Sequence, residues 1–243
     1  MNTPEQVYQR FRSMFTSDFT EEDFSNLLWY SDEDNMEELF DYLYTKLPYV
    51  ESFVYGASKL VAFLYGEPDW VIKFPLQGNA TFVKNDNGEY EADITDEYVY
   101  AWGRDSDFQD YDYCAVELVV YETLPKDCRK LVTSIQEVGK IGYVHAYVSN
   151  KVSRNVYSCG QASNDSIGKA REKVNSDERY DIDAYFLANF YDAYGEELSN
   201  KLFDNLATLG YGRDMHSRNF GKSKDGKIVC LDYADFNDFA EVI

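Results

Sequence analysis

Two carboxylates and one amide near the end of the chain have the types and spacing for one kind of chemistry. Asp214 and Asn219 lie in the segment Gly212 to Asn219, and Asp232 follows the apolar run Ile228 to Leu231. Phosphoryl transfer needs a carboxylate that orients the attacking hydroxyl, and oxygen ligands that hold magnesium against phosphate. Asp214 fits the first role, and Asn219 and Asp232 fit the second. These three residues would also serve as ordinary turn and capping residues, so both interpretations stay open.

Turn residues frame this group and predict how it is positioned. Gly210 and Gly212 open the first segment, and Asp225-Gly226 is a dipeptide typical of a β-hairpin. The run Ile228 to Leu231 is typical of a short buried strand. We therefore expect a loop, a hairpin, a strand and an acid, in that order.

The string Asp214-Met215-His216-Ser217-Arg218-Asn219 resembles the D-x-H-x-x-N catalytic loop of kinase-like phosphotransferases of the aminoglycoside and choline kinase types. Leu231-Asp232-Tyr233 resembles their metal-binding acid segment. The pattern also resembles that of small uncharacterised kinase-like proteins of phages and prophages of Gram-positive bacteria. This resemblance implies catalytic residues Asp214, His216 and Asn219 and magnesium ligands Asn219 and Asp232. His216 would support the loop by hydrogen bonding rather than act as the base.

The resemblance continues upstream, where a nucleotide would bind. In kinase-like folds the first hairpin covers the nucleotide phosphates and a lysine on the third strand contacts them. The segments Gly56 to Lys59 and Val71-Ile72-Lys73 match these parts by order and spacing, and the second resembles the V-A-I-K element. The implied ATP-binding residues are Gly56, Ser58, Lys59 and Lys73. A single Gly56 replaces the usual multi-glycine pattern, so Ser58 and Lys59 would supply the phosphate contacts.

A glutamate on a helix completes the implied nucleotide site. In the resembling families such a glutamate pairs with the strand lysine and holds it in position. Residues Tyr111 to Leu124 have the spacing of a helix, and Glu117 lies on it. Glu117 is therefore the candidate partner of Lys73, although a solvated glutamate would fit the same helix.

Composition limits the class of protein. At 243 residues, with 44% hydrophobic and 17% aromatic residues, the chain can bury a substantial core. The formal net charge of −21 argues against general binding to nucleic acids or anionic membranes, because phosphate groups would be repelled. The same charge would keep the protein in solution. It also allows a protein that imitates a nucleic acid and occupies the basic groove of a host factor.

The cysteines and the apolar runs predict the compartment. Cys114, Cys128, Cys159 and Cys230 are widely separated and form no pair of zinc-binding spacing. No apolar run approaches the ~20 residues of a membrane span, and the first residues do not resemble a signal peptide. We expect a cytoplasmic protein, in the host cytosol if a phage encodes it.

Capping residues and periodicity predict the remaining elements. Helices are expected at Pro4–Phe15, Glu21–Trp29, Asp34–Leu47 and Ile182–Leu209, the last broken at Gly195. Strands are expected at Ser52–Tyr55, Leu60–Tyr65, Trp70–Pro75, Leu131–Ile135 and Ile141–Val148, the last two joined by a turn at Val138-Gly139-Lys140. A hairpin around Asn87-Gly88 falls in a first insertion, 77–110, and Ser166–Val174 could form a short helix in a second, 153–180.

We therefore expect an α+β protein with a two-lobed, protein-kinase-like fold. It would have a helical N-terminal extension (1–50), a β-rich nucleotide-binding lobe (51–150) and a mainly helical lobe with the catalytic loop (151–243). Only eleven residues follow Asp232, so the second lobe would be truncated. The expected function is an ATP- and magnesium-dependent phosphotransferase acting on a small molecule or a host protein. A pseudokinase or binding module and an acidic phage inhibitor of a host nucleic-acid-binding or defence factor are the alternatives.

Overall fold

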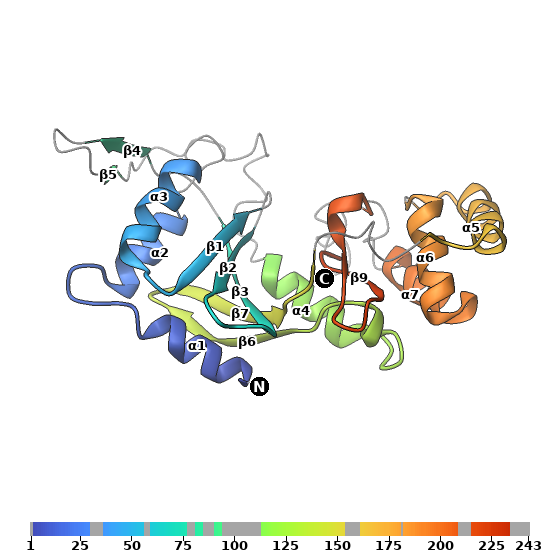
Figure 1. The fold of residues 1–243 in the computed structure, drawn as a ribbon, viewed down its shortest axis with the longest axis horizontal. Coiled ribbons are helices and arrows are strands. Elements are labelled where there is room, and N and C mark those ends of the chain that lie inside the picture. Colours follow the sequence, from blue (N-terminus) through green and yellow to red (C-terminus); the bar gives the residue numbers. More distant parts are fainter. Residues whose placement is uncertain are drawn as a thin grey trace. The chain divides into compact units, whose positions relative to one another are not determined.

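The computed structural model describes residues 2–29, 36–55, 59–76, 81–84, 90–93, 113–153, 161–180, 182–208 and 215–233. It is a mixed α+β structure built around an antiparallel sheet (Figure 1). The chain divides into two compact units, one of residues 1–116 and 135–149, the other of residues 117–134 and 150–243.

Three helices open the first unit: α1 (Pro4–Arg12), α2 (Glu21–Trp29) and α3 (Met36–Lys46). The capping residues expected at the first two of them are confirmed. At α1 the Gln6 amide donates to the Thr3 hydroxyl, and the Thr3 amide donates to the Gln6 side chain. At α2 the Thr20 amide donates to the Asp23 carboxylate at 2.8 Å and the Asp23 amide donates to the Thr20 hydroxyl. Each exchange satisfies backbone amides that the first helical turn leaves without a partner.

A five-stranded sheet follows, in the order β1-β2-β3-β7-β6. Its strands are β1 (Val50–Tyr55), β2 (Lys59–Leu64), β3 (Trp70–Pro75), β6 (Ile135–Ile141) and β7 (Val144–Asn150). The first three agree with the predicted strands, and β3 agrees residue for residue. Helix α4 (Tyr113–Thr123) precedes β6 in the chain. A separate antiparallel pair, β4 (Thr81–Lys84) and β5 (Tyr90–Asp93), confirms the strands of the expected hairpin, whose Asn87-Gly88 turn lies outside the described residues.

The predicted turn at Val138-Gly139-Lys140 is wrong, because β6 runs through it. A register shift between Glu137 and Gly139 makes a bulge there, and the two-residue turn falls instead at Gly142-Tyr143, where Gly142 has φ 59°. A β-bulge and a tight hairpin turn both favour glycine. The sequence alone therefore does not show which of Gly139 and Gly142 lies in the turn.

The predicted strand Leu131–Ile135 is also wrong. Arg129–Leu131 forms a 3-10 turn, and Val132 makes an isolated parallel bridge with Cys230. Leu131 and Val132 are buried in the second unit instead of entering the sheet.

One face of the sheet packs against the three helices to form a single apolar core. Apolar residues of α1, α2 and α3, which include Phe11, Phe24 and Leu39, meet alternate residues of the strands. The strand residues of this core are Val50, Phe53, Leu60, Ala62, Leu64, Ile72, Phe74, Ile141, Val144, Ala146 and Val148. The Tyr8 hydroxyl also donates to the Lys140 carbonyl at 2.6 Å, which fixes α1 to β6. The aromatic face of the N-terminal helices is therefore part of the core.

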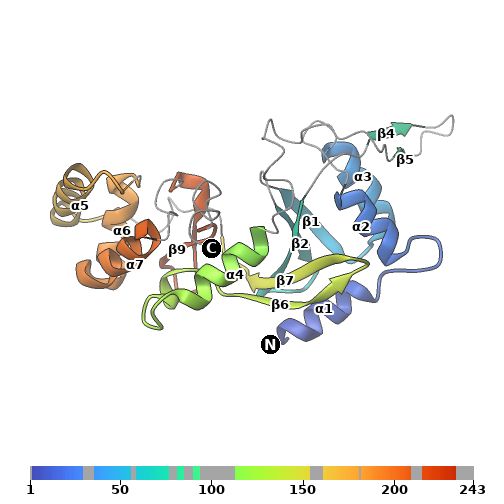
Figure 2. The same ribbon diagram turned by 180° about the vertical axis from the view of Figure 1, so that it is seen from behind.

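Helices dominate the second unit, with α5 (Asn164–Ser176) packed against α6 (Ala184–Tyr194), and α6 followed by α7 (Glu196–Thr208), as Figure 2 shows. The predicted break at Gly195 is confirmed: this residue caps α6 with φ 87°. Phe190 contacts the rings of Phe203 on α7 and Phe220 on β8 (Phe220–Lys222). Strand β9 (Ile228–Cys230) pairs with β8. No helix in the described part of the chain is long and apolar enough to cross a membrane.

Candidate functional site

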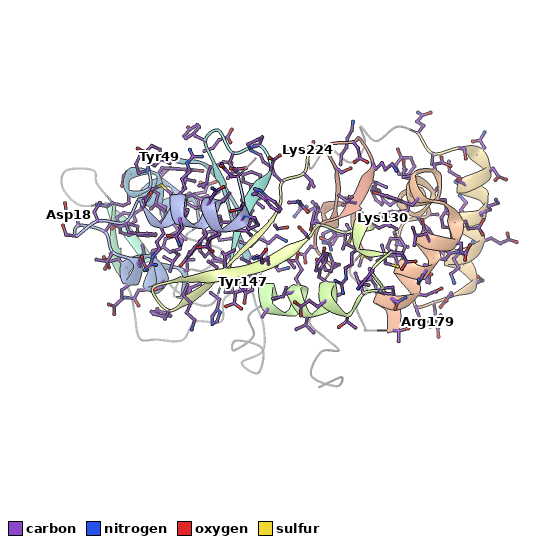
Figure 3. The ribbon with its side chains drawn as sticks, turned by 90° about the horizontal axis from the view of Figure 1, so that it is seen from below. Asp18, Tyr49, Lys130, Tyr147, Arg179 and Lys224 are labelled. Carbon is purple, nitrogen blue, oxygen red and sulfur yellow. The ribbon has the colours of Figure 1, made fainter. Side chains whose placement is uncertain are left out.

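The β8–β9 hairpin carries both predicted metal ligands (Figure 3, where Lys224 marks its turn). Phe220 pairs with Cys230, and beyond this pair the Leu231 amide donates to the Asn219 carbonyl at 2.7 Å. Asp232 is the next residue. Asn219 and Asp232 therefore lie at the same end of the hairpin, although thirteen positions separate them in the sequence.

The predicted turn of this hairpin is confirmed. Gly226 has φ 83°, a conformation that glycine adopts without steric cost, and its amide donates to the Ser223 carbonyl at 3.0 Å. Ser223 also donates from its backbone amide to the Lys227 carbonyl at 2.9 Å and from its hydroxyl to the Asp225 carboxylate at 2.5 Å. The turn is closed by its own hydrogen bonds, which fixes the register of the strands.

A 3-10 turn, Ser217–Asn219, leads into the hairpin, and His216 caps it. The Arg218 amide donates to Nδ1 of His216 at 3.1 Å, and the Asn219 amide donates to the His216 carbonyl at 3.0 Å. Met215, just before, makes a parallel bridge with Ile182. Asn219 is 7% exposed, so its side chain is held in a packed setting. Asp214, the predicted catalytic carboxylate, lies outside the described residues.

Thr133 anchors the backbone around Asp232, the second predicted metal ligand. The sequence did not single out this threonine. The Thr133 amide donates to the Cys230 carbonyl at 2.8 Å, and its hydroxyl donates to the Leu231 carbonyl at 3.3 Å. The Tyr233 hydroxyl donates to the Thr133 carbonyl at 2.8 Å. Hydrogen bonds to Thr133 therefore fix the residues on both sides of Asp232.

Glu117 on α4 lies in this same neighbourhood and is fully buried. Burial raises the pKa of Tyr233 well above its usual value, and the nearby charge of Glu117 raises it further. The carboxylate of Glu117 is therefore close to the Tyr233 hydroxyl. The predicted pair of Glu117 with Lys73 stays a prediction, because these two residues belong to different units.

Lys59 and Lys73 share one face of the sheet in the first unit. Their register places Lys59 opposite Pro75 and Val61 opposite Lys73, so the two lysines are diagonal neighbours. Side chains alternate along a strand, and Leu60, Ile72 and Phe74 face the helical core. Both lysines therefore face away from that core, yet they are only 5% and 7% exposed.

Lys59 departs from its expected place, because it opens β2 instead of belonging to the turn before it. Antiparallel pairing with Pro75 at the end of β3 draws the residue into the sheet. Gly56 and Ser58, the other two predicted phosphate-binding residues, lie outside the described residues.

The predicted site residues thus form two groups. Lys59 and Lys73 lie together in the first unit, and His216, Asn219, Asp232 and Glu117 lie in the second. Thr133 was missed because it bonds to Tyr233 across a hundred positions, and no local pattern reports a contact of that range. Tyr233 could be found from the sequence, because it directly follows Asp232 in the segment that resembles a metal-binding acid segment.

The chemistry of these groups fits the ligands that the resemblance implies. The amide oxygen of Asn219 and the carboxylate of Asp232 are hard oxygen donors, which are the ligands that magnesium takes. Two buried ammonium groups on one face suit the phosphates of a nucleotide. Comparison of the sequence with models of known protein families gives no match, and comparison with curated proteins gives none either.

Proposed function

We propose that this protein is an ATP- and magnesium-dependent phosphotransferase with a two-lobed, kinase-like fold, whose acceptor is a small molecule or a host protein. The proposal rests on Asn219 and Asp232, which the 2.7 Å bond between the Leu231 amide and the Asn219 carbonyl sets at one end of the hairpin. Both are needed at one place to hold a metal, and this arrangement of the hairpin, with Thr133 bonded to the residues on either side of Asp232, supports that role.

Each residue of the site has one role in the proposed reaction. Lys59 and Lys73 bind the phosphates, and Glu117 holds Lys73 in position. Asn219 and Asp232 hold magnesium, which when bound neutralises charge on the phosphate oxygens. Asp214 orients the acceptor hydroxyl for attack. Thr133 is a positioning residue, because it acts through the backbone on either side of Asp232.

The order of the elements supports the kinase-like part of the proposal. A hairpin, β1–β2, is followed by the lysine strand β3, the glutamate helix α4 and the strand β7, which lies beside β3 in the sheet. Helices α6 and α7 then lead to the Ser217–Asn219 turn and to Asp232. This is the sequence of parts expected from the resemblance, and the division into two compact units is what two lobes require.

The first experiment measures the melting temperature of the full chain with and without magnesium-ATP. A ligand that binds only the native state, at a hundred times its Kd, stabilises it by about 2.7 kcal/mol. For a chain of this size that is a rise of roughly 5–10 °C. We expect the rise in the parent, and its loss in Lys73→Met and in Asp232→Asn.

A matched control lies on the same hairpin. Asp225→Asn makes the identical change at the exposed turn and should keep the response to magnesium-ATP. An unchanged melting temperature of the parent in millimolar magnesium-ATP would contradict the proposal. A rise without any transfer of the terminal phosphate, to added acceptors or to the protein itself, would support the binding module and reject the enzyme.

A further inference from the structure

Ser149 is a buried polar residue that the proposed reaction does not use. It is 1% exposed and lies near the end of β7. Its Oγ has no hydrogen-bond partner among the described residues. Most buried hydroxyl groups in native proteins are hydrogen-bonded, so one that is not calls for a physical reason.

The pattern of the strand shows which face Ser149 occupies. Val144, Ala146 and Val148 belong to the core beneath the helices. Tyr147 and Ser149 alternate with them and therefore lie on the opposite face, and Figure 3 labels Tyr147 on this strand. That is the face of Lys59 and Lys73.

Three neighbouring strands thus contribute a buried polar group to one face. Lys59 comes from β2, Lys73 from β3 and Ser149 from β7, and these strands are adjacent in the order of the sheet. Neighbouring strands lie about 4.8 Å apart, so β2 and β7 lie about 10 Å apart across the sheet. A nucleoside triphosphate is long enough to reach across that span, with charged phosphates at one end and a neutral polar nucleoside at the other.

Energetics separates a ligand-binding hydroxyl from a structural one. A buried hydroxyl without a partner destabilises the free protein, because it has lost its hydrogen bonds to water. A structural serine is retained because it bonds within the fold, as Ser25 does by donating to the Glu22 carbonyl at 2.9 Å. Ser149 stabilises nothing in this way among the described residues.

We infer that Ser149 is a ligand-contacting residue of the nucleotide site, and that its hydroxyl hydrogen-bonds to the nucleoside part while Lys59 and Lys73 bind the phosphates. The inference rests on the proposed function and adds a specificity-determining residue to it. Ser149 makes the site select nucleotides over simple polyphosphates, at the expense of stability in the free protein.

The test compares Ser149→Thr with Ser149→Val in the full chain. Threonine and valine have the same shape, so any strain from the added methyl group is common to both, and only the hydroxyl differs. Without ligand, Ser149→Val should melt about 2 °C or more above Ser149→Thr. Affinity for magnesium-ATP, from the concentration dependence of the melting temperature, should be about tenfold weaker in the valine variant.

Inorganic tripolyphosphate with magnesium is the second probe, because it carries the phosphates without the nucleoside. Both variants should bind it equally, and Lys59→Met should weaken the binding of both probes. Ser149→Ala repeats the comparison against the parent, in case the added methyl group prevents folding. Ser25→Ala is the control for a buried serine with a partner, and should lower the melting temperature and leave both affinities unchanged.

The two failures are distinguishable. Equal ATP affinities in the threonine and valine variants, with a response to ATP preserved in the parent, would overturn the role of Ser149 and leave the proposed function standing. That is also the result expected if the hydroxyl bonds to a buried water. A parent that does not respond to magnesium-ATP would overturn both.

Discussion

Tyr233 illustrates how single side chains hold the residues of the site. Its ring is 1% exposed, and its hydroxyl donates to the Thr133 carbonyl at 2.8 Å. Burial and the nearby Glu117 raise its pKa, so the hydroxyl keeps its proton and remains a donor into the alkaline range. The bond thus fixes the backbone beside Asp232 throughout the pH range of any assay near neutrality.

Tyr233→Phe should therefore lower the free energy of unfolding by about 1–3 kcal/mol, because the change leaves a buried carbonyl group without its donor. The ring stays, so the fold should persist. Urea denaturation measures the loss. The magnesium concentration needed for ATP binding should also rise, because Asp232 is less firmly placed, and a purely structural role would leave it unchanged.

The control makes the same change on the surface. Tyr143 is 42% exposed, and its hydroxyl donates to the Asn26 side chain at 2.7 Å. Because water can replace that bond, Tyr143→Phe should change the free energy of unfolding by no more than about 0.5 kcal/mol. Equal losses in the free energy of unfolding would show that the buried hydrogen bond to Thr133 stabilises the protein no more than an exposed one.

Among the elements, helix α2 and the β6–β7 turn approach each other closely. A Cβ atom on Gly142 would meet the Ser25 hydroxyl and lie 2.5 Å from the Glu21 carbonyl oxygen. Gly142 also has φ 59°. The turn can approach the helix only because residue 142 has no side chain and adopts a left-handed conformation.

Gly142→Ala should destabilise the protein by two separable effects. The left-handed conformation costs an alanine about 1–2 kcal/mol, and the overlap with α2 adds about 1–3 kcal/mol. Gly66→Ala isolates the first effect, because Gly66 has φ 69° and nothing within 4 Å of the added atom. Chemical denaturation of both variants gives the difference. Equal losses would mean that α2 is not held against the turn.

Local sequence signals predicted the helices and strands well wherever only one residue could mark the end of an element. The capping residues Thr3 and Thr20 and the break at Gly195 marked helix ends, and the apolar neighbours of Lys73 marked β3. The predicted position of the turn between β6 and β7 was wrong because two glycines three positions apart both suit a turn. The contact of Gly142 with α2 decides between them, and a tertiary contact of this kind cannot be read from the local sequence.

The candidate site shows the same limit over longer distances. The Asp225-Gly226 turn was predicted from the sequence, and the hairpin that it closes puts Asn219 and Asp232 at the same end. No such device links Thr133 to Tyr233, whose hydrogen bond spans a hundred positions. Nor did the sequence place Lys59 in the sheet, since the pairing of β2 with β3 decides where the strand begins.

For the whole molecule, charge is the dominant property. The chain carries 44 acidic and 23 basic residues, a formal net charge of −21. Ion pairs such as Arg12 with Glu21 and Lys201 with Asp127 lie at the surface, where each contributes little. At neutral pH, repulsion among the unbalanced carboxylates therefore outweighs these pairs and opposes the compact state.

Salt should consequently stabilise this protein at pH 7. Raising the potassium chloride concentration from about 0.02 M to about 0.3 M shortens the screening length to below 10 Å, which weakens the long-range repulsion more than the contacts within ion pairs. We expect the melting temperature to rise by a few degrees. The control is the same titration near the isoelectric point of about 4.4, where the net charge vanishes and only attractive pairs remain to be screened. There the melting temperature should stay constant or fall. A fall at pH 7 would mean that the surface ion pairs, and not the excess of carboxylates, determine the electrostatic stability.

Magnesium should act on the same repulsion without ATP, so the effect of magnesium alone must be subtracted before a response to magnesium-ATP is assigned to the hairpin of Asn219 and Asp232.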